Sequence, residues 1–96
     1  MRVRWLQAAL ANVNAEVDYI ARDNPAAADR VLSRIEEAVK HLSEHPSIGR
    51  AGRVHGTREL VVSGTPYIIP YRVRADAVEI LRVFHAARRW PTEFEG

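Results

Sequence analysis

Apolar residues recur at helical spacing through the first half of the chain. The first set alternates steps of four and three residues, which places its members on one face of an amphipathic helix. Its members are Leu6, Leu10, Val13, Val17 and Ile20. The second set has the same kind of spacing and consists of Ala28, Val31, Leu32, Ile35, Ala38, Val39 and Leu42. The pattern predicts two helices, preceded by a short apolar strand at residues 3–5.

Local signals indicate where these helices end. We expect the first helix to end near Asp23, because Asn24-Pro25 is typical of an N-cap followed by proline at the first position of a new helix. We expect the second to stop at His45-Pro46, since proline disfavours helical backbone in the residue before it. Two amphipathic helices joined by a tight turn predict a helical hairpin.

The period of the pattern changes from helical to alternating after a glycine-rich loop at residues 46–56. Strands are predicted at residues 58–62, 67–74 and 78–85, with turn residues between them. They would form a three-stranded antiparallel meander able to cover the apolar stripes of the hairpin. The predicted fold class is α+β in two layers. A short N-terminal strand and the hairpin pack on a small antiparallel sheet, in the order β-α-α-β-β-β, within a single domain of residues 1–96.

Alternation also assigns side chains to the two faces of this sheet. In the middle strand, the residues expected under the helices are Tyr67, Ile69, Tyr71 and Val73, and those on the other face are Ile68, Pro70, Arg72 and Arg74. In the last strand we expect Leu81 and Val83 to pack inward and Ile80, Arg82 and Phe84 to face outward. The prediction is an open face carrying Arg72 and Arg82, bordered by Arg58, His85, Arg88 and Arg89. A solvated face that binds nothing is the alternative.

Two residues in the second half of the chain interrupt or follow the alternating strand pattern. Pro70 cannot donate a ladder hydrogen bond, so we expect a bulge or an unpaired position beside it. Trp90 follows the last strand, and we expect its ring to be buried as the anchor of the C-terminal tail, with its N–H in contact with water. An exposed Trp90 that contacts a target is the alternative.

Composition excludes several classes of function. The chain is 47% hydrophobic and 27% charged, as in ordinary globular domains, and it has no cysteine for a disulfide, a thiolate nucleophile or a cysteine-based zinc site. His41 and His45 stand four residues apart, but no third ligand is evident, so we predict no metal site and no cofactor. No apolar run is long enough for a signal peptide or a membrane span, so we expect a cytoplasmic protein without membrane contact.

Charge is distributed unevenly along the chain. Residues 1–49 hold six Lys/Arg against seven Asp/Glu, whereas residues 50–96 hold eight Arg against five Asp/Glu. Because the planar guanidinium fork matches phosphate and carboxylate, the C-terminal excess of arginine favours an anionic partner. Scattered arginines that only keep the domain soluble are the alternative.

Four motifs follow one another in the second half of the chain. They are E-H-P before the glycine-rich loop, G-x-R-E-L at residues 56–60, P-Y-x-x-x-Y-R-V at residues 66–73 and E-I-L-R-V-x-H-x-x-R-x-W-P at residues 79–91. In this order, and after a helical hairpin, they resemble the RelE/ParE superfamily of toxins from bacterial type II toxin-antitoxin modules, and the ParE-like branch most closely. The resemblance covers nearly the whole chain.

The resemblance implies a growth-inhibiting toxin of the kind associated with plasmid stabilisation. A co-encoded antitoxin would neutralise it, with an acidic tail that wraps across the hairpin and the sheet. The superfamily has two modes of action. ParE-like members are described as poisoning DNA gyrase without known catalytic chemistry, and RelE-like members are ribosome-dependent mRNA endoribonucleases that use basic residues with a tyrosine or histidine.

Both modes of action have candidate residues in this sequence. If the chain is a ribonuclease, the expected catalytic residues are His85, Arg82 and Arg72. If it acts by binding, the residues expected to contact a target or the antitoxin are Arg58, Arg72, Arg82, Arg88, Arg89 and Trp90. There is no lysine after residue 40 and no tyrosine in the C-terminal tail, so the sequence favours gyrase over mRNA as the target. An inactive or differently targeted member is the remaining alternative.

Overall fold

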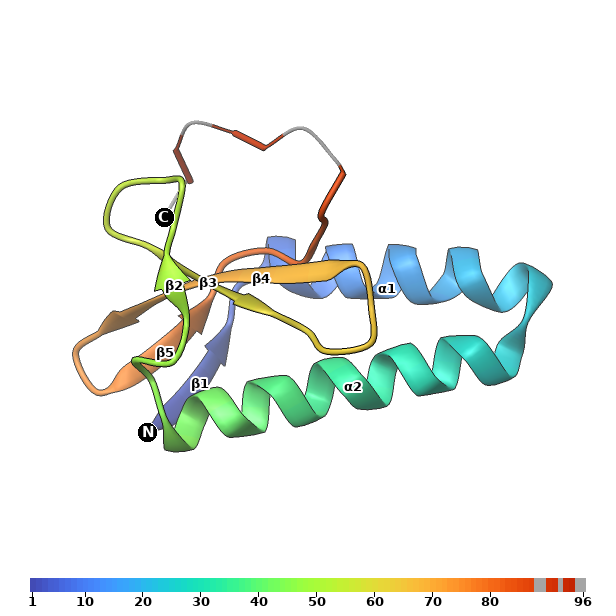
Figure 1. Ribbon diagram of the computed structural model, residues 1–96, viewed down its shortest axis with the longest axis horizontal. Helices are drawn as coiled ribbons and strands as arrows, with labels where there is room; N and C mark the ends of the chain where they lie inside the picture. Colours follow the sequence, from blue (N-terminus) through green and yellow to red (C-terminus); the bar gives the residue numbers. More distant parts are fainter. Residues whose placement is uncertain (88–89, 92, 95–96) are drawn as a thin grey trace.

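The structure, a computed structural model, describes residues 1–87, 90–91 and 93–94 of the chain. Its helices are α1 (Gln7–Asp23) and α2 (Pro25–Glu44). Its strands are β1 (Arg2–Trp5), β2 (Arg50–Ala51), β3 (Arg58–Val61), β4 (Tyr67–Arg74), β5 (Ala77–Ile80) and β6 (Phe84–His85). The two helices run side by side as an antiparallel hairpin and form one layer, and the sheet forms the other (Figure 1). The predicted α+β fold class is confirmed.

The hairpin turns at Asn24, which ends one helix and begins the next. Its backbone N–H donates to the Ile20 carbonyl at 2.9 Å, and its side-chain oxygen accepts from the Ala27 N–H at 3.1 Å. Pro25 occupies the first position of α2, where its missing N–H costs no hydrogen bond. At the other end, His45 closes α2 by donating its N–H to the His41 carbonyl. Both predicted helix ends are therefore confirmed.

The sheet has the strand order β1-β5-β4-β3-β2, with β6 also paired to β4. The predicted antiparallel meander is present as β3, β4 and β5. The N-terminal strand β1 joins its edge in parallel with β5, in the register Arg2↔Ala77 to Trp5↔Ile80. Parallel pairing needs a long connection, and the intervening hairpin and meander supply it. The sheet is consequently mixed.

A bulge interrupts the last strand beside Pro70. Ile68 pairs with Phe84 and Tyr71 pairs with Ile80, so residues 81–83 lie opposite only Ile69 and Pro70. Within the interruption, the Val83 N–H donates to the Asn12 side chain at 3.1 Å instead of to β4. The extra residue is what defines a β-bulge, and the expected interruption beside Pro70 is confirmed.

The bulge changes which side chains face the helices. Val78 and Ile80 lie in the core cluster together with Val83, whereas Leu81 is fully buried outside that cluster. The sequence-based expectation is therefore right for Val83 and wrong for Ile80 and Leu81, because one inserted residue shifts the alternation of the strand.

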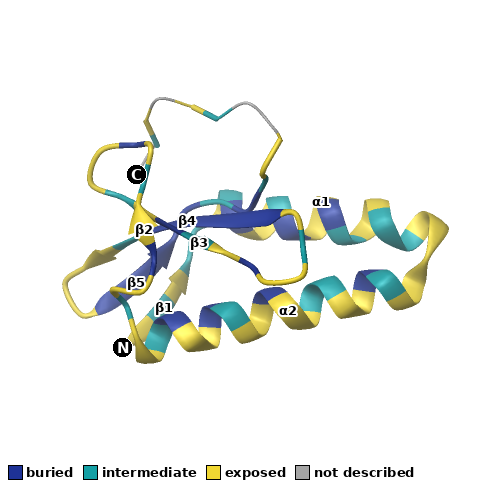
Figure 2. Cartoon of the chain, viewed as in Figure 1, coloured by how far each residue is buried: buried dark blue, intermediate teal, exposed yellow. Residues whose placement is uncertain are grey.

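The face of β4 that was expected to be open is largely covered. Tyr67, Ile69 and Tyr71 lie in the core as predicted, but Val73 is 46% exposed near the strand end. On the opposite face Ile68 and Pro70 are also buried, so that most of β4 is buried on both sides (Figure 2).

The C-terminal tail provides part of this cover. The ring of Phe84 packs against Trp90, with ring centroids 4.9 Å apart, and against Phe94 at 6.2 Å. The prediction of an open face is therefore wrong for this part of the sheet, because the chain itself places aromatic side chains over it.

Candidate functional site

Two buried glutamates organise the sheet face that points away from the helices. Glu59 on β3 and Glu79 on β5 have side chains that are only 3% exposed. Glu59 stands opposite Pro70, and Glu79 stands opposite Arg72. Pro70 and Arg72 are two residues apart in β4, so both glutamates lie on the same face. A buried carboxylate needs partners of opposite charge, and arginines surround each of them.

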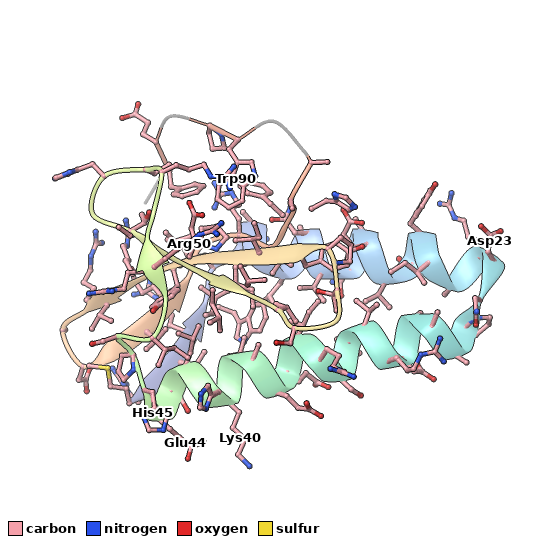
Figure 3. The ribbon with its side chains drawn as sticks, viewed as in Figure 1. Asp23, Lys40, Glu44, His45, Arg50 and Trp90 are labelled. Carbon is pink, nitrogen blue, oxygen red and sulfur yellow. The ribbon has the colours of Figure 1, made fainter. Side chains whose placement is uncertain are left out.

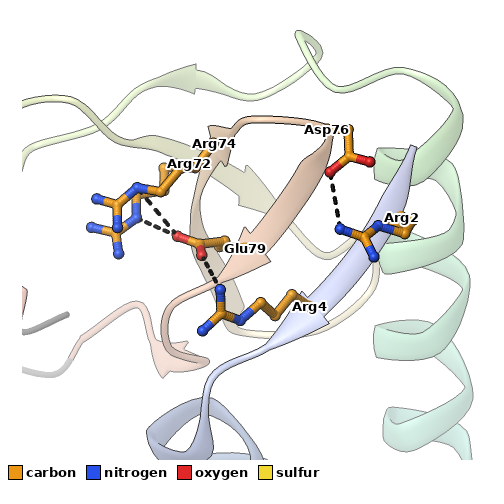
Figure 4. Close-up of polar contacts among 6 residues, drawn as sticks. All are labelled: Arg2, Arg4, Arg72, Arg74, Asp76 and Glu79. Carbon is orange, nitrogen blue, oxygen red and sulfur yellow. Dashed lines mark hydrogen bonds and ion pairs between the residues drawn. The ribbon is translucent and has the colours of Figure 1, made fainter.

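Three arginines converge on Glu79 (Figure 4). Arg72 Nε lies 2.7 Å from one carboxylate oxygen, Arg74 Nε lies 3.8 Å from the same oxygen, and Arg4 Nη1 lies 3.1 Å from the other. The hydrogen bond from Arg72 lowers the pKa of Glu79 below the ordinary range of a glutamate, and the charges of the three arginines act in the same direction. Glu79 is therefore held as a carboxylate.

Glu59 forms a second cluster with the loop that follows α2. Arg50 Nη2 lies 3.1 Å from one oxygen and Arg53 Nε lies 3.3 Å from the other. The backbone N–H of Arg53 also donates to Glu59 at 2.8 Å. These contacts fasten the loop to β3.

We define the arginine face as the five arginines that pair with these two glutamates. They are Arg4, Arg50, Arg53, Arg72 and Arg74. Arg72 is 15% exposed, whereas the other four side chains are between 45% and 68% exposed. Among the described residues, these five positive charges stand against two negative ones, and this excess of positive charge suits an anionic partner.

Among the predicted site arginines that the structure describes, only Arg72 belongs to the arginine face. Arg82 donates to the Leu81 carbonyl at 2.6 Å and lies over the ring of Phe94. Arg58 pairs with the core residue Tyr71 and donates to the Gly49 carbonyl at 2.8 Å, so it lies on the helix side of the sheet and does not border the arginine face. Arg88 and Arg89 lie outside the described residues.

His85 lies on the opposite side of the sheet from Arg72. It stands across from Tyr67, with ring centroids 5.8 Å apart, and the Tyr67 hydroxyl donates to Glu16 at 3.1 Å. Directly paired residues share a face, and Tyr67 belongs to the core under the helices. Because β4 separates them, the structure does not bring His85 together with Arg72. The catalytic roles assigned to these residues remain predictions.

A groove of about 610 Å³ runs past His85 between the sheet and the hairpin. Its lining residues are Ala15, Glu16, Tyr19, Ile20, Val31, Pro66, Tyr67 and His85. A second groove of about 450 Å³ lies on the hairpin and is mainly apolar, lined by Trp5, Leu10, Val13, Asn14, Leu32, Ile35, Glu36, Val39 and Lys40. Both grooves are open surfaces on which another chain could lie.

Trp90 anchors the tail as expected. It lies on the side of the sheet away from α2 (Figure 3), with the Arg53 guanidinium 3.7 Å from its ring centroid and Phe84 packed against it. The expectation that its N–H reaches water is wrong, because this group is buried and finds no acceptor among the described residues. The stack on Arg53 connects the tail to the loop of the Glu59 cluster.

Three glutamates of the described residues are buried without having been predicted from the sequence: Glu16, Glu59 and Glu79. Glu59 and Glu79 lie in strands, and arginines occur in the same or adjacent strands. This pattern indicates buried ion pairs only once the register between the strands is known. Across the described residues, no three His, Asp or Glu side chains form a group that could hold a metal ion. Within the same residues, no helix is long and apolar enough to cross a membrane.

The helical hairpin on a small mixed sheet, together with the arginine-rich strand motifs, is the architecture of the RelE/ParE superfamily of small toxins. Within this superfamily the chain belongs to the ParE family, since the model described as "ParE toxin of type II toxin-antitoxin system, parDE" matches residues 3–90.

Individual relatives agree with the assignment to the superfamily. The chain is 51% identical over 90 residues to a protein named putative toxin Y4kP of Sinorhizobium fredii, covering 94% of this chain and 93% of the relative. It is 42% identical to toxin RelE2 of Caulobacter vibrioides, covering 91% and 97%. A solved structure titled "Chromosomal ParDE TA system from P. aeruginosa" superposes with a TM-score of 0.80 at 30% identity, covering 88% of this chain and 95% of the other.

Proposed function

We propose that this ParE-family toxin inhibits growth in the cytoplasm by binding and poisoning DNA gyrase, and that it does so without catalysing a reaction. The observation that supports this proposal is the separation of the candidate catalytic residues. His85 lies on the helix side of the sheet, and Arg72 lies on the arginine face.

RNA cleavage needs an acid or base and a positive charge at the same phosphate, within hydrogen-bonding distance of the reacting atoms. Arg72 is 15% exposed and its Nε is held 2.7 Å from the Glu79 carboxylate. Much of its charge is therefore already neutralised by the protein itself. A binding surface does not have this requirement, because its charges only need to match those of the partner.

We also propose that a co-encoded antitoxin with an acidic tail neutralises the toxin. The apolar groove on the hairpin is lined by Leu10, which is 47% exposed, and by core residues such as Val13 and Ile35. An apolar segment of the antitoxin would bury this surface, and acidic residues of its tail would pair with the arginine face.

Ribosome-dependent mRNA cleavage remains the second candidate function. It is favoured by the groove in which Glu16, Tyr67 and His85 lie together, because these side chain types can transfer protons. The two proposals make opposite predictions for a His85 variant.

Expression of the chain without antitoxin tests these proposals in growing cells. We expect wild type and His85→Ala to inhibit growth equally, with loss of plasmid supercoiling and intact mRNA, because binding does not need the imidazole. His55→Ala, in the exposed loop before β3, serves as the matched control. Supercoiling and mRNA integrity are measured in parallel, and co-purification with the antitoxin verifies the fold. If His85→Ala alone removes toxicity while wild type cuts ribosome-bound mRNA, gyrase is not the target.

A further inference from the structure

We infer that the arginine face binds the phosphate backbone of double-stranded DNA directly. This inference goes beyond the proposed function and does not depend on it, because it concerns the toxin and DNA alone. It rests on how the arginines are held, how far they are spread across the sheet, and how charge is divided between the two layers.

The buried glutamates hold the arginines in position. Arg4 uses Nη1 to contact Glu79, and Arg50 uses Nε and Nη2 to contact Glu59. A guanidinium has five N–H donors, so these contacts fix the side chain without using all of its donors. The side chains of Arg4 and Arg50 remain 68% and 54% exposed. Arginines that are already ordered lose less conformational freedom when they bind a phosphate.

The arginine face spans the width of the sheet. Arg4 lies on β1 and Arg50 on β2, which are the two outermost strands in the order β1-β5-β4-β3-β2. Four strand spacings correspond to roughly 19 Å. A B-DNA duplex carries one charge per about 1.7 Å of its axis with both strands counted, so a duplex segment of this length carries on the order of ten phosphates, of which only those on the near side face the sheet. A row of fixed positive charges suits such a partner.

The hairpin has the opposite charge, which favours a duplex over a flexible chain that is acidic along its whole length. Residues 7–44 contain four Lys/Arg against seven Asp/Glu, whereas the rest of the chain contains ten Arg against five Asp/Glu. A uniformly acidic chain that wraps around both layers meets repulsion over the hairpin, which the antitoxin proposed above avoids because its apolar segment covers the hairpin. A stiff duplex contacts the sheet side only and avoids that repulsion. The charge distribution therefore matches a rigid polyanion that approaches from one side.

Fluorescence anisotropy with a labelled 20-base-pair duplex of arbitrary sequence tests this inference. If Arg4, Arg50 and Arg53 each neutralise one phosphate, a plot of log K against log salt concentration has a slope of about −2.7. In Arg4→Gln/Arg50→Gln the slope becomes shallower by about 1.8, and binding in 50 mM salt weakens by more than about tenfold. In this variant Glu79 still pairs with Arg72 and Glu59 still pairs with Arg53, so we expect the fold to be retained. Thermal unfolding verifies this.

Matched variants make the result decisive. Arg22→Gln/Arg30→Gln removes the same charge from exposed positions of the hairpin and should leave both the slope and the affinity unchanged. Arg4→Lys/Arg50→Lys keeps the charges and should keep most of the slope. The inference is overturned if the duplex does not bind in 50 mM salt, or if the hairpin variant loses as much affinity as the sheet variant. It is also overturned if a polyglutamate peptide of equal charge binds at least as tightly as the duplex.

Discussion

Glu79→Ala is expected to lower the free energy of unfolding by about 3 kcal/mol, which is typical when one partner of a buried ion pair is removed. The Glu79 side chain is 3% exposed and accepts from Arg72 at 2.7 Å, and Arg72 is itself only 15% exposed. Without the carboxylate, Arg72 and Arg74 on β4 and Arg4 on β1 repel one another across β5. Chemical denaturation of both proteins at neutral pH measures the difference.

Asp76→Ala is the matched control for this prediction. Asp76 pairs with Arg2 at 3.0 Å, but both side chains are more than 70% exposed, so its loss should cost less than about 1 kcal/mol. Equal effects of the two substitutions would show that the Glu79 cluster contributes no more than a surface ion pair.

The pH dependence of stability gives an independent measure of the same cluster. Because Arg72 lowers the pKa of Glu79 in the folded protein, the unfolded chain takes up the proton first as the pH falls below about 4.5. The contribution of Glu79 is therefore present at neutral pH and is lost progressively below that value. Glu79→Gln should flatten this part of the stability profile, whereas an unchanged profile would show that Glu79 does not cause the loss.

Gly49→Ala is expected to destabilise the fold by about 2–3 kcal/mol. A methyl group at this position would lie 2.5 Å from both Cε1 and the hydroxyl oxygen of Tyr71. That hydroxyl accepts from the Gly49 N–H at 2.8 Å and donates to the Pro46 carbonyl at 2.7 Å. Since Tyr71 is fully buried, its ring cannot move aside without losing these bonds and core packing. Thermal and chemical unfolding measure the loss.

Gly56→Ala separates this packing effect from a general glycine effect. Gly56 lies in the same loop with a φ of +78°, and nothing lies within 4 Å of the position of an added methyl group. Only the backbone strain of about 1 kcal/mol is expected there. A loss at Gly49 no larger than the loss at Gly56 would contradict the role of the Tyr71 contact.

The helical layer could be predicted from the sequence because its signals are local. The apolar spacing, the Asn24-Pro25 cap and the His45-Pro46 stop each act within one or two turns of helix. The three central strands were also recognisable from alternation. The parallel pairing of β1 with β5 was not, since it joins residues about 75 positions apart and leaves no local pattern.

The candidate site could be predicted only in part. The excess of arginine indicated an anionic partner, and Arg72 was placed on the correct face. In the last strand the alternation failed, because the bulge at residues 81–83 adds one residue, so the residues before and after it do not follow one alternating pattern. Val83 and Phe84 lie as predicted, whereas Ile80 lies on the face opposite to the predicted one. The pairing of Glu59 and Glu79 with arginines depends on the register between strands, which single-sequence patterns do not contain.

We propose that the chain acts on gyrase by binding and does not act on mRNA by cleavage. The most direct measurement adds the purified chain to DNA gyrase with relaxed plasmid, and in parallel to ribosomes loaded with mRNA. We predict that supercoiling stops and cleaved plasmid accumulates, with the mRNA intact, and that added antitoxin reverses the effect. Unimpaired supercoiling together with cut mRNA would contradict the claim.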